Sequence, residues 1–494
     1  MANKVSIVSL GCPKNLVDSD NLTRRLISNG FSYLHNPDDA DILLINTCGF
    51  IEDAKKESIE EILKLAKLKK GSRIQGDSPR RVASGDKGSR EKTSSALEPL
   101  NHRTPEPYPK LIVFGCLAKR YKDELIKEIS EIDAIFGVGE EERIVEYCKK
   151  IRGIGDLGLG LSKINPQPLT PNPGSYAYLK IADGCNKKCT YCVIPSIRGK
   201  YKSIVPDEII KEAKRLIEAG VKELILVAQD TACYGKDLNE YNIASLLKDL
   251  CSINGDFWIR LLYAYPASIS DSLLNVIAGE DKICKYLDIP FQHSEDRILK
   301  LMRRRGNRKE YLTLIRDIRR NIPDIALRTT FIVGFPSETE KEFNPLIDFI
   351  EEVRFDRLGV FRYSKEEGTP ASELRGHVAE AVKRERLDKI MRHQARISLE
   401  KNKELIGRKF KAIVDEISEG AAIGRLYSHA PEIDGVVIIE SPEGRRQKAP
   451  PHPPLAKGGT RGGAHSSLLK AGDFVNVEIT DAFDYDLKGI LLDE

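Results

Sequence analysis

The chain has 494 residues, of which 41% are hydrophobic and 31% charged, and its formal net charge is +4. This length accommodates two to four domains with cores of their own, and the composition is that of a globular protein. The near balance of charge argues against the class of strongly basic nucleic-acid-binding proteins. The first ten residues lack a signal-peptide pattern, and no run of about 18 apolar residues occurs, so we expect a cytoplasmic protein without membrane spans. In that reducing compartment the ten cysteines are more often thiols or metal ligands than disulfides.

Residues 1–150 alternate between strand and helix patterns. Short, continuous apolar strands between amphipathic helices indicate a parallel sheet covered on both faces, so an α/β domain is expected here. The expected strands are 5–10, 41–46 and 110–115, and the expected helices are 15–30 and 52–70.

Two segments interrupt this pattern, at residues 71–109 and 445–467. Both are rich in Ser, Arg, Gly and Pro and have little apolar surface to bury. We therefore expect both to be disordered surface insertions whose basic residues are solvated. A linker is expected over residues 151–174, which become rich in proline from Asn165 onward.

Residues 175–402 carry a second series of strands and helices that ends in a long charged helix. Six strand patterns with helices between most of them predict a partial (β/α)6 barrel, whose chemistry lies at the carboxyl ends of the strands. The tail, residues 403–494, is rich in strands and predicts a small β-barrel or sandwich. The expected strands are 175–182, 222–229, 257–263, 286–291, 326–334 and 357–364, followed in the tail by 409–417, 435–440 and 474–480.

Three cysteines, Cys185, Cys189 and Cys192, lie within the nine residues GCNKKCTYC, directly after the first strand of the second series. Thiolates at this spacing can surround one metal centre. Iron–sulfur clusters normally take four cysteines. Three would leave one iron with an open coordination position, which a reactive site needs. Lys187 and Lys188 would offset the thiolate charge, and the alternative is a zinc knuckle with a distant fourth ligand.

Three further cysteines, Cys12, Cys48 and Cys116, each come just past a predicted strand and next to a glycine. The carboxyl ends of parallel strands lie along one edge of a sheet, where ligand crevices form. Glycine permits close backbone approach to a bulky ligand. We therefore expect these thiols to converge and to hold a second metal centre. The alternative is three unrelated buried thiols, since cysteine packs as a small hydrophobe.

The pattern C-x3-C-x2-C, with Tyr191 before its last cysteine, resembles the radical S-adenosylmethionine (radical SAM) superfamily. The resemblance implies a reduced 4Fe–4S cluster whose open iron binds S-adenosylmethionine and cleaves it to a 5′-deoxyadenosyl radical. It also implies that Tyr191 lies near the adenine and that Ile332, Gly334 and Glu338 contact the cofactor. Thr330 stands where that family usually has glycine.

The whole arrangement resembles the methylthiotransferases over essentially the full chain. It combines an N-terminal three-cysteine domain, a radical SAM barrel and a small β tail, which in that family is a TRAM domain. The resemblance implies two 4Fe–4S clusters, of which the second binds S-adenosylmethionine. The implied ligands are Cys12, Cys48 and Cys116 for the first cluster, and Cys185, Cys189 and Cys192 for the second.

The motifs resemble one branch of the methylthiotransferases more than the other. The branch acting on transfer RNA usually opens with Gly-Cys-Gln-Met-Asn, whereas SLGCPKN (Ser9 to Asn15) resembles the RimO branch, which acts on a ribosomal protein. The stretches INTCGFIEDAKKES, VAQDTACYG, DIPFQHSEDRILKLMRR, HAPEIDG and DAFDYDL also resemble that branch. The implied reaction is methylthiolation of the β-carbon of one aspartate in small-subunit ribosomal protein number twelve, with an electron donor such as flavodoxin or ferredoxin. The departures are the two insertions and Ser337, which replaces a glycine common in the family.

The charge of the tail points to a protein rather than an RNA partner. Residues 403–494 contain 12 Lys and Arg against 15 Asp and Glu. An RNA-binding module should be basic, whereas an acidic one complements a basic ribosomal protein. RNA binding is therefore not expected as the main role. Two alternatives stay open: a methylthiotransferase acting on a transfer-RNA adenosine, and a non-catalytic iron–sulfur or zinc-binding scaffold.

Other polar residues are weaker candidates. Positions at the ends of barrel strands often line a site, although His293 could equally be a helix-start residue satisfied by local hydrogen bonds. Three consecutive arginines are interpreted as a solvated helix face rather than an anion site. The strand-end candidates are Gln229, Asp230, Gln292 and His293, the arginines are Arg303, Arg304 and Arg305, and the cysteines expected to be structural are Cys148, Cys233, Cys251 and Cys284.

Overall fold

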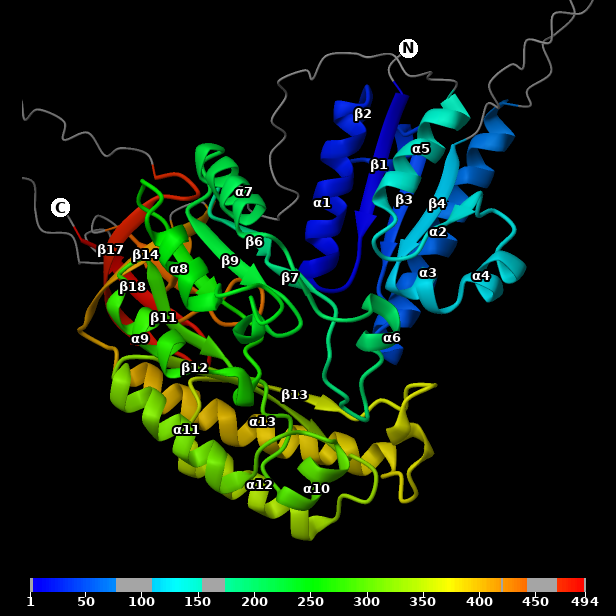
Figure 1. The fold of residues 1–494 in the computed structure, drawn as a ribbon. Coiled ribbons are helices and arrows are strands. Elements are labelled where there is room, and N and C mark those ends of the chain that lie inside the picture. The colour runs from blue at the N-terminus through cyan, green and yellow to red at the C-terminus, as the bar shows by residue number, and fades with distance from the viewer. Residues whose placement is uncertain (1–2, 77–108, 153–173, 419–420, 442–468, 493–494) are drawn as a thin grey trace, which may run out of the picture. The chain divides into compact units, whose positions relative to one another are not determined.

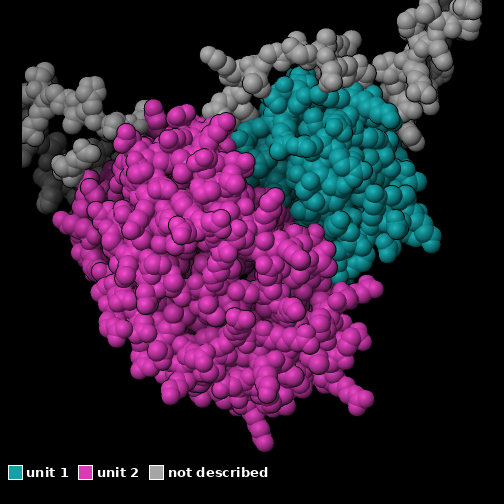
Figure 2. All heavy atoms as spheres, in the orientation of Figure 1, with its two compact units in different colours: residues 1–164 teal, residues 165–494 magenta. Residues whose placement is uncertain are grey.

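The computed structural model describes residues 3–76, 109–152, 174–418, 421–441 and 469–492. The chain divides into two compact units, residues 1–164 and 165–494, which Figure 2 colours separately. The expected insertion at 445–467, residues 77–108 of the other insertion and residues 153–173 of the linker lie outside the described residues. Residues 71–76 instead continue helix α2, and helix α5 extends to Arg152. Residues 71–76 and 151–152 were thus wrongly assigned to the insertion and the linker, because an established helix gains further residues easily.

The first unit contains a five-stranded parallel sheet in the order β2-β1-β3-β4-β5 (Figure 1). Apolar residues of the central strands alternate between two cores, with Ile42 and Leu44 in one and Leu43 and Ile45 in the other. Helices therefore cover both faces, which confirms the expected α/β domain. The strands are β1 (Asn3–Ser9), β2 (Phe31–Tyr33), β3 (Ile42–Thr47), β4 (Lys110–Gly115) and β5 (Ala134–Ile135), and the helices are α1 (Pro13–Ser28), α2 (Glu52–Gly76), α3 (Cys116–Arg120), α4 (Lys122–Glu128) and α5 (Glu141–Arg152).

The second unit contains a six-stranded parallel sheet in the order β13-β12-β11-β10-β9-β6. Strands that come one after another in this series are neighbours in the sheet. Figure 1 shows the connecting helices lying along the sheet. This sheet confirms the expected partial (β/α)6 barrel. The strands are β6 (Tyr176–Lys180), β9 (Glu223–Val227), β10 (Trp258–Leu261), β11 (Ile283–Asp288), β12 (Ala326–Val333) and β13 (Arg357–Arg362).

The helices of the second unit pack on one face of this sheet. Alternate strand residues such as Leu224, Leu226 and Ile259 share a core with the helices, whereas Arg260 and Tyr286 lie on the opposite face. The helices are α6 (Ile194–Arg198), α7 (Pro206–Glu218), α8 (Ile243–Cys251), α9 (Asp271–Gly279), α10 (Asp296–Leu301), α11 (Arg308–Asn321), α12 (Glu340–Val353) and α13 (Glu380–Lys403), with two short strands, β7 (Ala182–Asp183) and β8 (Lys202–Ser203), paired beside the sheet.

The tail forms a closed five-stranded barrel in the order β14-β15-β16-β18-β17, which confirms the expected small β-barrel. Two of its strands, β15 and β18, were not predicted, because each contains a glycine and too few β-branched residues to stand out. No helix in the described part of the chain is long and apolar enough for a bilayer. The strands are β14 (Lys409–Ser418), β15 (Ala421–Leu426), β16 (Val437–Glu440), β17 (Phe474–Ala482) and β18 (Leu487–Leu491).

Candidate functional site

Cys12, Cys48 and Cys116, hereafter the first trio, lie at the carboxyl ends of three adjacent strands. Cys12 is the N-cap of α1 and follows β1, Cys48 follows β3 directly, and Cys116 is the first residue of α3, directly after β4. Because β1, β3 and β4 are neighbours in the sheet, the three thiols come to one edge of it.

Contacts of two glycines show how closely these segments approach one another. A Cβ atom at Gly11 would lie 3.0 Å from the Sγ atom of Cys48. A Cβ atom at Gly49 would lie 3.0 Å from the backbone carbonyl carbon of Cys116. Both positions therefore require glycine, and the segments that carry the first trio touch.

Asn15, the last residue of the SLGCPKN stretch, ties these segments together. Its side-chain amide donates to the carbonyl oxygens of Leu10, at 2.9 Å, and Thr47, at 3.2 Å. Its Oδ1 atom lies 3.7 Å from the Sγ atom of Cys116. The sequence analysis did not predict this role for Asn15. The available signal was an amide side chain near the start of α1, at a position of the helix that faces the core.

Cys185, Cys189 and Cys192, hereafter the second trio, lie in the loop that follows β6 and β7. The Cys185 backbone N–H donates to the Gly199 carbonyl at 3.0 Å. The Lys187 backbone N–H points at the Cys185 Sγ atom, 3.4 Å away. Thr190 donates through its hydroxyl to the Leu301 carbonyl at 2.9 Å, so the loop is anchored at the end of α10. The loop is thus held in place by the chain itself.

Burial disfavours negative charge on Cys185 and Cys192. It raises the pKa of the Cys185 thiol above its ordinary value and that of Cys192 to about 12. The neighbouring thiols raise both pKa values further, and Arg304 opposes the rise at Cys192. A thiolate at Cys185 or Cys192 therefore needs a bound cation or metal to remain deprotonated.

Both trios offer thiols only, which is the ligand set of iron–sulfur clusters. All ten cysteines are thiols rather than half-cystines. A zinc knuckle draws its sulfurs to about 2.3 Å from a single ion, whereas a cluster interposes several iron and sulfide atoms between its thiolates.

Lys187 lowers the pKa of the Cys185 thiol, as expected of a cation near the thiolates, and its ammonium also pairs with a buried carboxylate. Its Nζ atom lies 3.3 Å from a carboxylate oxygen of Asp230 and 3.2 Å from the Ser268 hydroxyl. Asp230 itself is buried and accepts a hydrogen bond from the same hydroxyl at 2.7 Å. Asp230, a strand-end candidate, thus helps to fix the cysteine loop.

The residues expected to contact S-adenosylmethionine fall into two groups. Tyr191 and Ile332 both pack against one apolar cluster, although they are far apart in the sequence. Gly334 has a left-handed backbone with φ of 71°, and a Cβ atom there would lie 2.3 Å from the Lys383 side chain. The members of the cluster are Ile298, Met302, Phe335, Tyr363 and Ala371.

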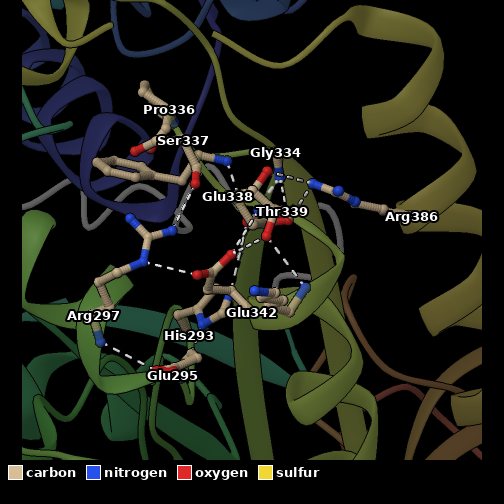
Figure 3. Close-up of polar contacts among 12 residues, drawn as sticks. His293, Glu295, Arg297, Gly334, Pro336, Ser337, Glu338, Thr339, Glu342 and Arg386 are labelled. Atoms are coloured by element: carbon tan, nitrogen blue, oxygen red, sulfur yellow. Dashed lines mark hydrogen bonds and ion pairs between the residues drawn. The ribbon is translucent and has the colours of Figure 1, made fainter. Parts of the chain in front are cut away.

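Glu338 is buried, and its carboxylate is already satisfied by the chain (Figure 3). It accepts from the Gly334 N–H at 3.0 Å, from the Phe335 N–H at 3.3 Å and from the Arg386 guanidinium at 2.9 Å. These donors use most of the carboxylate's lone pairs. Glu338 therefore holds the turn after β12, and with it the backbone of Gly334.

The three other strand-end candidates also have local partners. The Nδ1 atom of His293 accepts from the Glu295 N–H at 3.0 Å, so the ring carries its proton on Nε2, which lies 3.5 Å from Glu338. Local hydrogen bonding therefore accounts for only one ring nitrogen of His293, because its Nε2 atom is buried without a hydrogen-bond partner. Gln292 exchanges backbone hydrogen bonds with β12 and has φ of 72°, an uncommon value for a residue with a side chain. Gln229 donates to Asp183 at 3.2 Å.

The arginine run was predicted wrongly at one position. Arg303 and Arg305 are exposed, as expected of a solvated segment. Arg304 is buried, and its guanidinium lies 4.2 Å from the centre of the Tyr265 ring. The chain turns through a left-handed residue, Arg303 with φ of 51°, which sends the next side chain inward.

Comparison with known families follows the same division of the chain. Residues 179–350 match the radical SAM superfamily, and residues 406–492 match the TRAM domain. Residues 4–76 match a family described as Uncharacterized protein family UPF0004.

A solved structure shares the fold. The radical S-adenosylmethionine methyltransferase TsrM of Kitasatospora setae, solved with cobalamin and a [4Fe-4S] cluster, has a TM-score of 0.50. It is 12% identical, and the match covers 86% of this chain and 81% of that one. At this identity the likeness concerns the fold alone.

Curated relatives are much more similar. The ribosomal protein uS12 methylthiotransferase RimO of Thermodesulfovibrio yellowstonii is 49% identical over 487 residues, which are 99% of each chain. The proteins of the same name from Clostridioides difficile and Geotalea uraniireducens are 41% and 42% identical, and each match covers at least 98% of both chains. At this identity and coverage, the chain belongs to the RimO family of radical SAM methylthiotransferases.

Proposed function

We propose that this protein is a ribosomal protein uS12 methylthiotransferase, which adds a methylthio group to the β-carbon of one aspartate. The observation that carries the proposal is the meeting of the first trio at one edge of its sheet, in a chain whose second trio has the C-x3-C-x2-C spacing. One open-cornered cluster suffices for radical formation. A second is needed when sulfur must also be supplied.

In this proposal each trio ligates one 4Fe–4S cluster, and the cluster on the second trio binds S-adenosylmethionine. With both groups bound, the clusters and S-adenosylmethionine supply the radical, the sulfur and the methyl group. Such chemistry is required because a β-carbon beside a carboxylate offers neither a nucleophile nor a leaving group.

The chain's own residues bind and orient in this scheme. The Lys187 N–H donates to the Cys185 sulfur, which stabilises it as a thiolate. Tyr191 and Ile332 offer an apolar contact for the adenine ring. Gly334 presents backbone to the cofactor, and Glu338 acts by holding Gly334 rather than by touching the cofactor.

The C-terminal barrel is proposed to receive the protein substrate. In the turn between β17 and β18, Phe483 and Tyr485 are exposed alongside Asp481 and Asp484. Exposed aromatic rings among carboxylates suit a basic protein partner, and an RNA surface would be basic instead. RNA binding is therefore not proposed as the main role.

Three further expectations belong to this proposal. The reaction needs an external electron donor, such as flavodoxin or ferredoxin. A cytoplasmic location follows from a ribosomal substrate. The functional domains are taken as 1–150, 175–402 and 403–494, with the linker at 151–174.

Single-cysteine variants test the proposal. With uS12 as substrate under anaerobic conditions, Cys189→Ala should abolish formation of 5′-deoxyadenosine, and Cys12→Ala should retain it while yielding no methylthiolated aspartate. Cys251→Ala, a half-buried cysteine outside both trios, is the matched control and should retain product. Unchanged 5′-deoxyadenosine formation by Cys189→Ala, or a methylthio group on a transfer-RNA adenosine instead of aspartate, would refute the proposal.

A further inference from the structure

Arg304 follows closely the residues to which the loop of the second trio is hydrogen-bonded. Thr190, between Cys189 and Cys192, donates through its backbone N–H to the Met302 carbonyl at 3.1 Å. Its hydroxyl bonds to the preceding carbonyl, that of Leu301, at 2.9 Å. The cysteine loop is thus bonded to the two residues that precede the arginine turn.

The Arg304 guanidinium is nearly removed from water, with 9% of the residue exposed. One terminal nitrogen donates to the Pro290 carbonyl, and the group lies 4.2 Å from the centre of the Tyr265 ring. Its Nε atom is buried and has no hydrogen-bond partner. A ring face and one carbonyl offset only part of the cost of burying a full positive charge.

Three other buried arginines of the same unit are matched by carboxylates, whereas Arg357 bonds to a backbone carbonyl, the Asn402 amide oxygen and His429 instead. Arg260 pairs with Glu223, Arg386 with Glu338, and Arg425 with both Glu223 and Asp415. Arg304 forms no ion pair with any carboxylate among the described residues. Its positive charge is therefore unmatched by the chain itself.

The second cation near this loop, Lys187, differs from Arg304 because it is paired with a carboxylate. Lys187 shares the Tyr265 ring with Arg304, also at 4.2 Å from the ring centre. Lys187, however, pairs with Asp230 at 3.3 Å. The charge of Arg304 interacts electrostatically with Tyr191 and Cys189 of the cysteine loop, and with the Cys192 thiol.

We propose that Arg304 is the counter-charge of the metal centre held by the second trio and raises that centre's reduction potential. The inference rests on the proposed function. One-electron reduction makes the centre more negative, and a buried cation beside it stabilises the reduced form. Arg304 thus acts through its positive charge on the metal centre, and it does not act on the substrate.

A redox titration of the full chain tests this inference. The parent carries Cys12→Ala, Cys48→Ala and Cys116→Ala, so that only one centre remains, and it is reconstituted with iron and sulfide without oxygen. Dithionite titration is followed by electron paramagnetic resonance without S-adenosylmethionine. In Arg304→Gln or Arg304→Met, we expect the equilibrium constant for reduction to fall about tenfold, which is ~59 mV for one electron. Arg304→Lys should restore most of that loss.

The matched control is Arg305→Gln, which removes the same charge from the exposed neighbour and should leave the potential unchanged. A neutral variant with full iron and the parent potential would overturn the inference, as would an equal shift in the control. Two neutral variants are used because either could lose the cluster. Loss of iron in both, with iron and potential retained in Arg304→Lys, supports the need for charge; loss in all three overturns it. A parent without iron would instead refute the proposed function.

Discussion

Ser337 shows what one residue contributes to the turn after β12. Its φ is 63°, in the left-handed region that favours glycine. The turn is held regardless: the Ser337 N–H donates to the Gly376 carbonyl at 2.7 Å, and its own carbonyl accepts from Arg297 at 2.6 Å. The glycine common in the family at this position therefore suits the left-handed backbone of the turn. This chain keeps the same backbone conformation with a serine, which is strained there.

We predict that Ser337→Gly raises the free energy of unfolding slightly. Removing the strain of the left-handed serine stabilises the folded protein by about 1–2 kcal/mol. The greater conformational freedom of glycine in the unfolded chain opposes this by about 0.4–1 kcal/mol. Urea unfolding would measure the difference. Ser337→Ala is the control and should be close to neutral, whereas Ser337→Val should destabilise; a destabilised glycine variant would show that the serine hydroxyl matters more than the backbone.

At this scale the sequence predicted clusters of reactive residues and missed solitary ones. The six proposed cysteine ligands stood out through their spacing and their places after strands. Asn15 and Arg304 did not, because one amide in a helix and one arginine in a charged run have no periodic signature. Their roles depend on tertiary contacts, namely with Leu10 and Thr47 for the amide and with Tyr265 for the arginine.

The loop between β15 and β16 carries the HAPEIDG stretch. It reaches the face of the six-stranded sheet on which Arg260 and Tyr286 lie. Glu432 accepts from the hydroxyls of Tyr176, at 2.9 Å, and Tyr178, at 2.8 Å. Asp434 accepts from the Tyr286 hydroxyl at 2.7 Å. Carboxylates of the C-terminal barrel thus bond to strands β6 and β11, and the stretch that marked the branch has a structural role.

His429 lies in the same loop and is fully buried against arginines. Its ring contacts the Arg357 guanidinium, and burial, followed by the charges of Arg357, Arg260 and Arg425, holds its pKa well below the usual 6.5. The ring is therefore neutral in the folded protein. Below pH 6.5 the unfolded chain binds a proton that the folded chain does not, so acidification favours unfolding.

We predict that the free energy of unfolding falls by up to about 1.4 kcal/mol for each pH unit below 6.5 on account of His429. Urea unfolding of the metal-free protein between pH 7.5 and 5.5 would measure this slope. His429→Gln should flatten it, because a glutamine amide accepts from Arg357 without titrating. His393→Gln, at a more exposed histidine paired with Glu351, is the control; equal slopes in wild type and His429→Gln would contradict the assignment.

Elements with a strong pattern were predicted well, and those with a weak pattern were not. The strand at 110–115 was predicted at its observed bounds. Strand β11 begins at Ile283, three residues before the expected start. Lys285 interrupts its apolar run because its ammonium bonds to carbonyls at the end of α9, including that of Glu280 at 2.9 Å. That contact exists only in the folded chain.

Within the second unit, the sheet and the C-terminal barrel are joined by a buried ion network. Glu223 of β9, fully buried, pairs with Arg260 of β10 and with Arg425 of β15, the latter at 2.6 Å. Arg425 also pairs with Asp415, at 2.6 Å. A buried pair of this kind is costly to break, because each partner left behind is an unpaired charge.

We predict that Glu223→Gln destabilises the second unit by about 3–5 kcal/mol. It leaves Arg260 and Arg425 with less negative charge than they need. Chemical denaturation followed by tryptophan fluorescence is suitable, because Trp258 packs against Phe474 of the C-terminal barrel, with ring centres 4.9 Å apart. Glu218→Gln, at the exposed end of α7, should change little; equal stability of both variants would show that the network is not needed.

The account of the whole molecule depends on two iron–sulfur centres with three cysteine ligands each. The direct measurement is iron and sulfide content after anaerobic reconstitution, in wild type and in two variants, each with one trio replaced by alanine. We expect roughly eight iron atoms per wild-type chain and roughly four in each variant. A wild-type chain with only four, unchanged when the first trio is removed, would contradict the account.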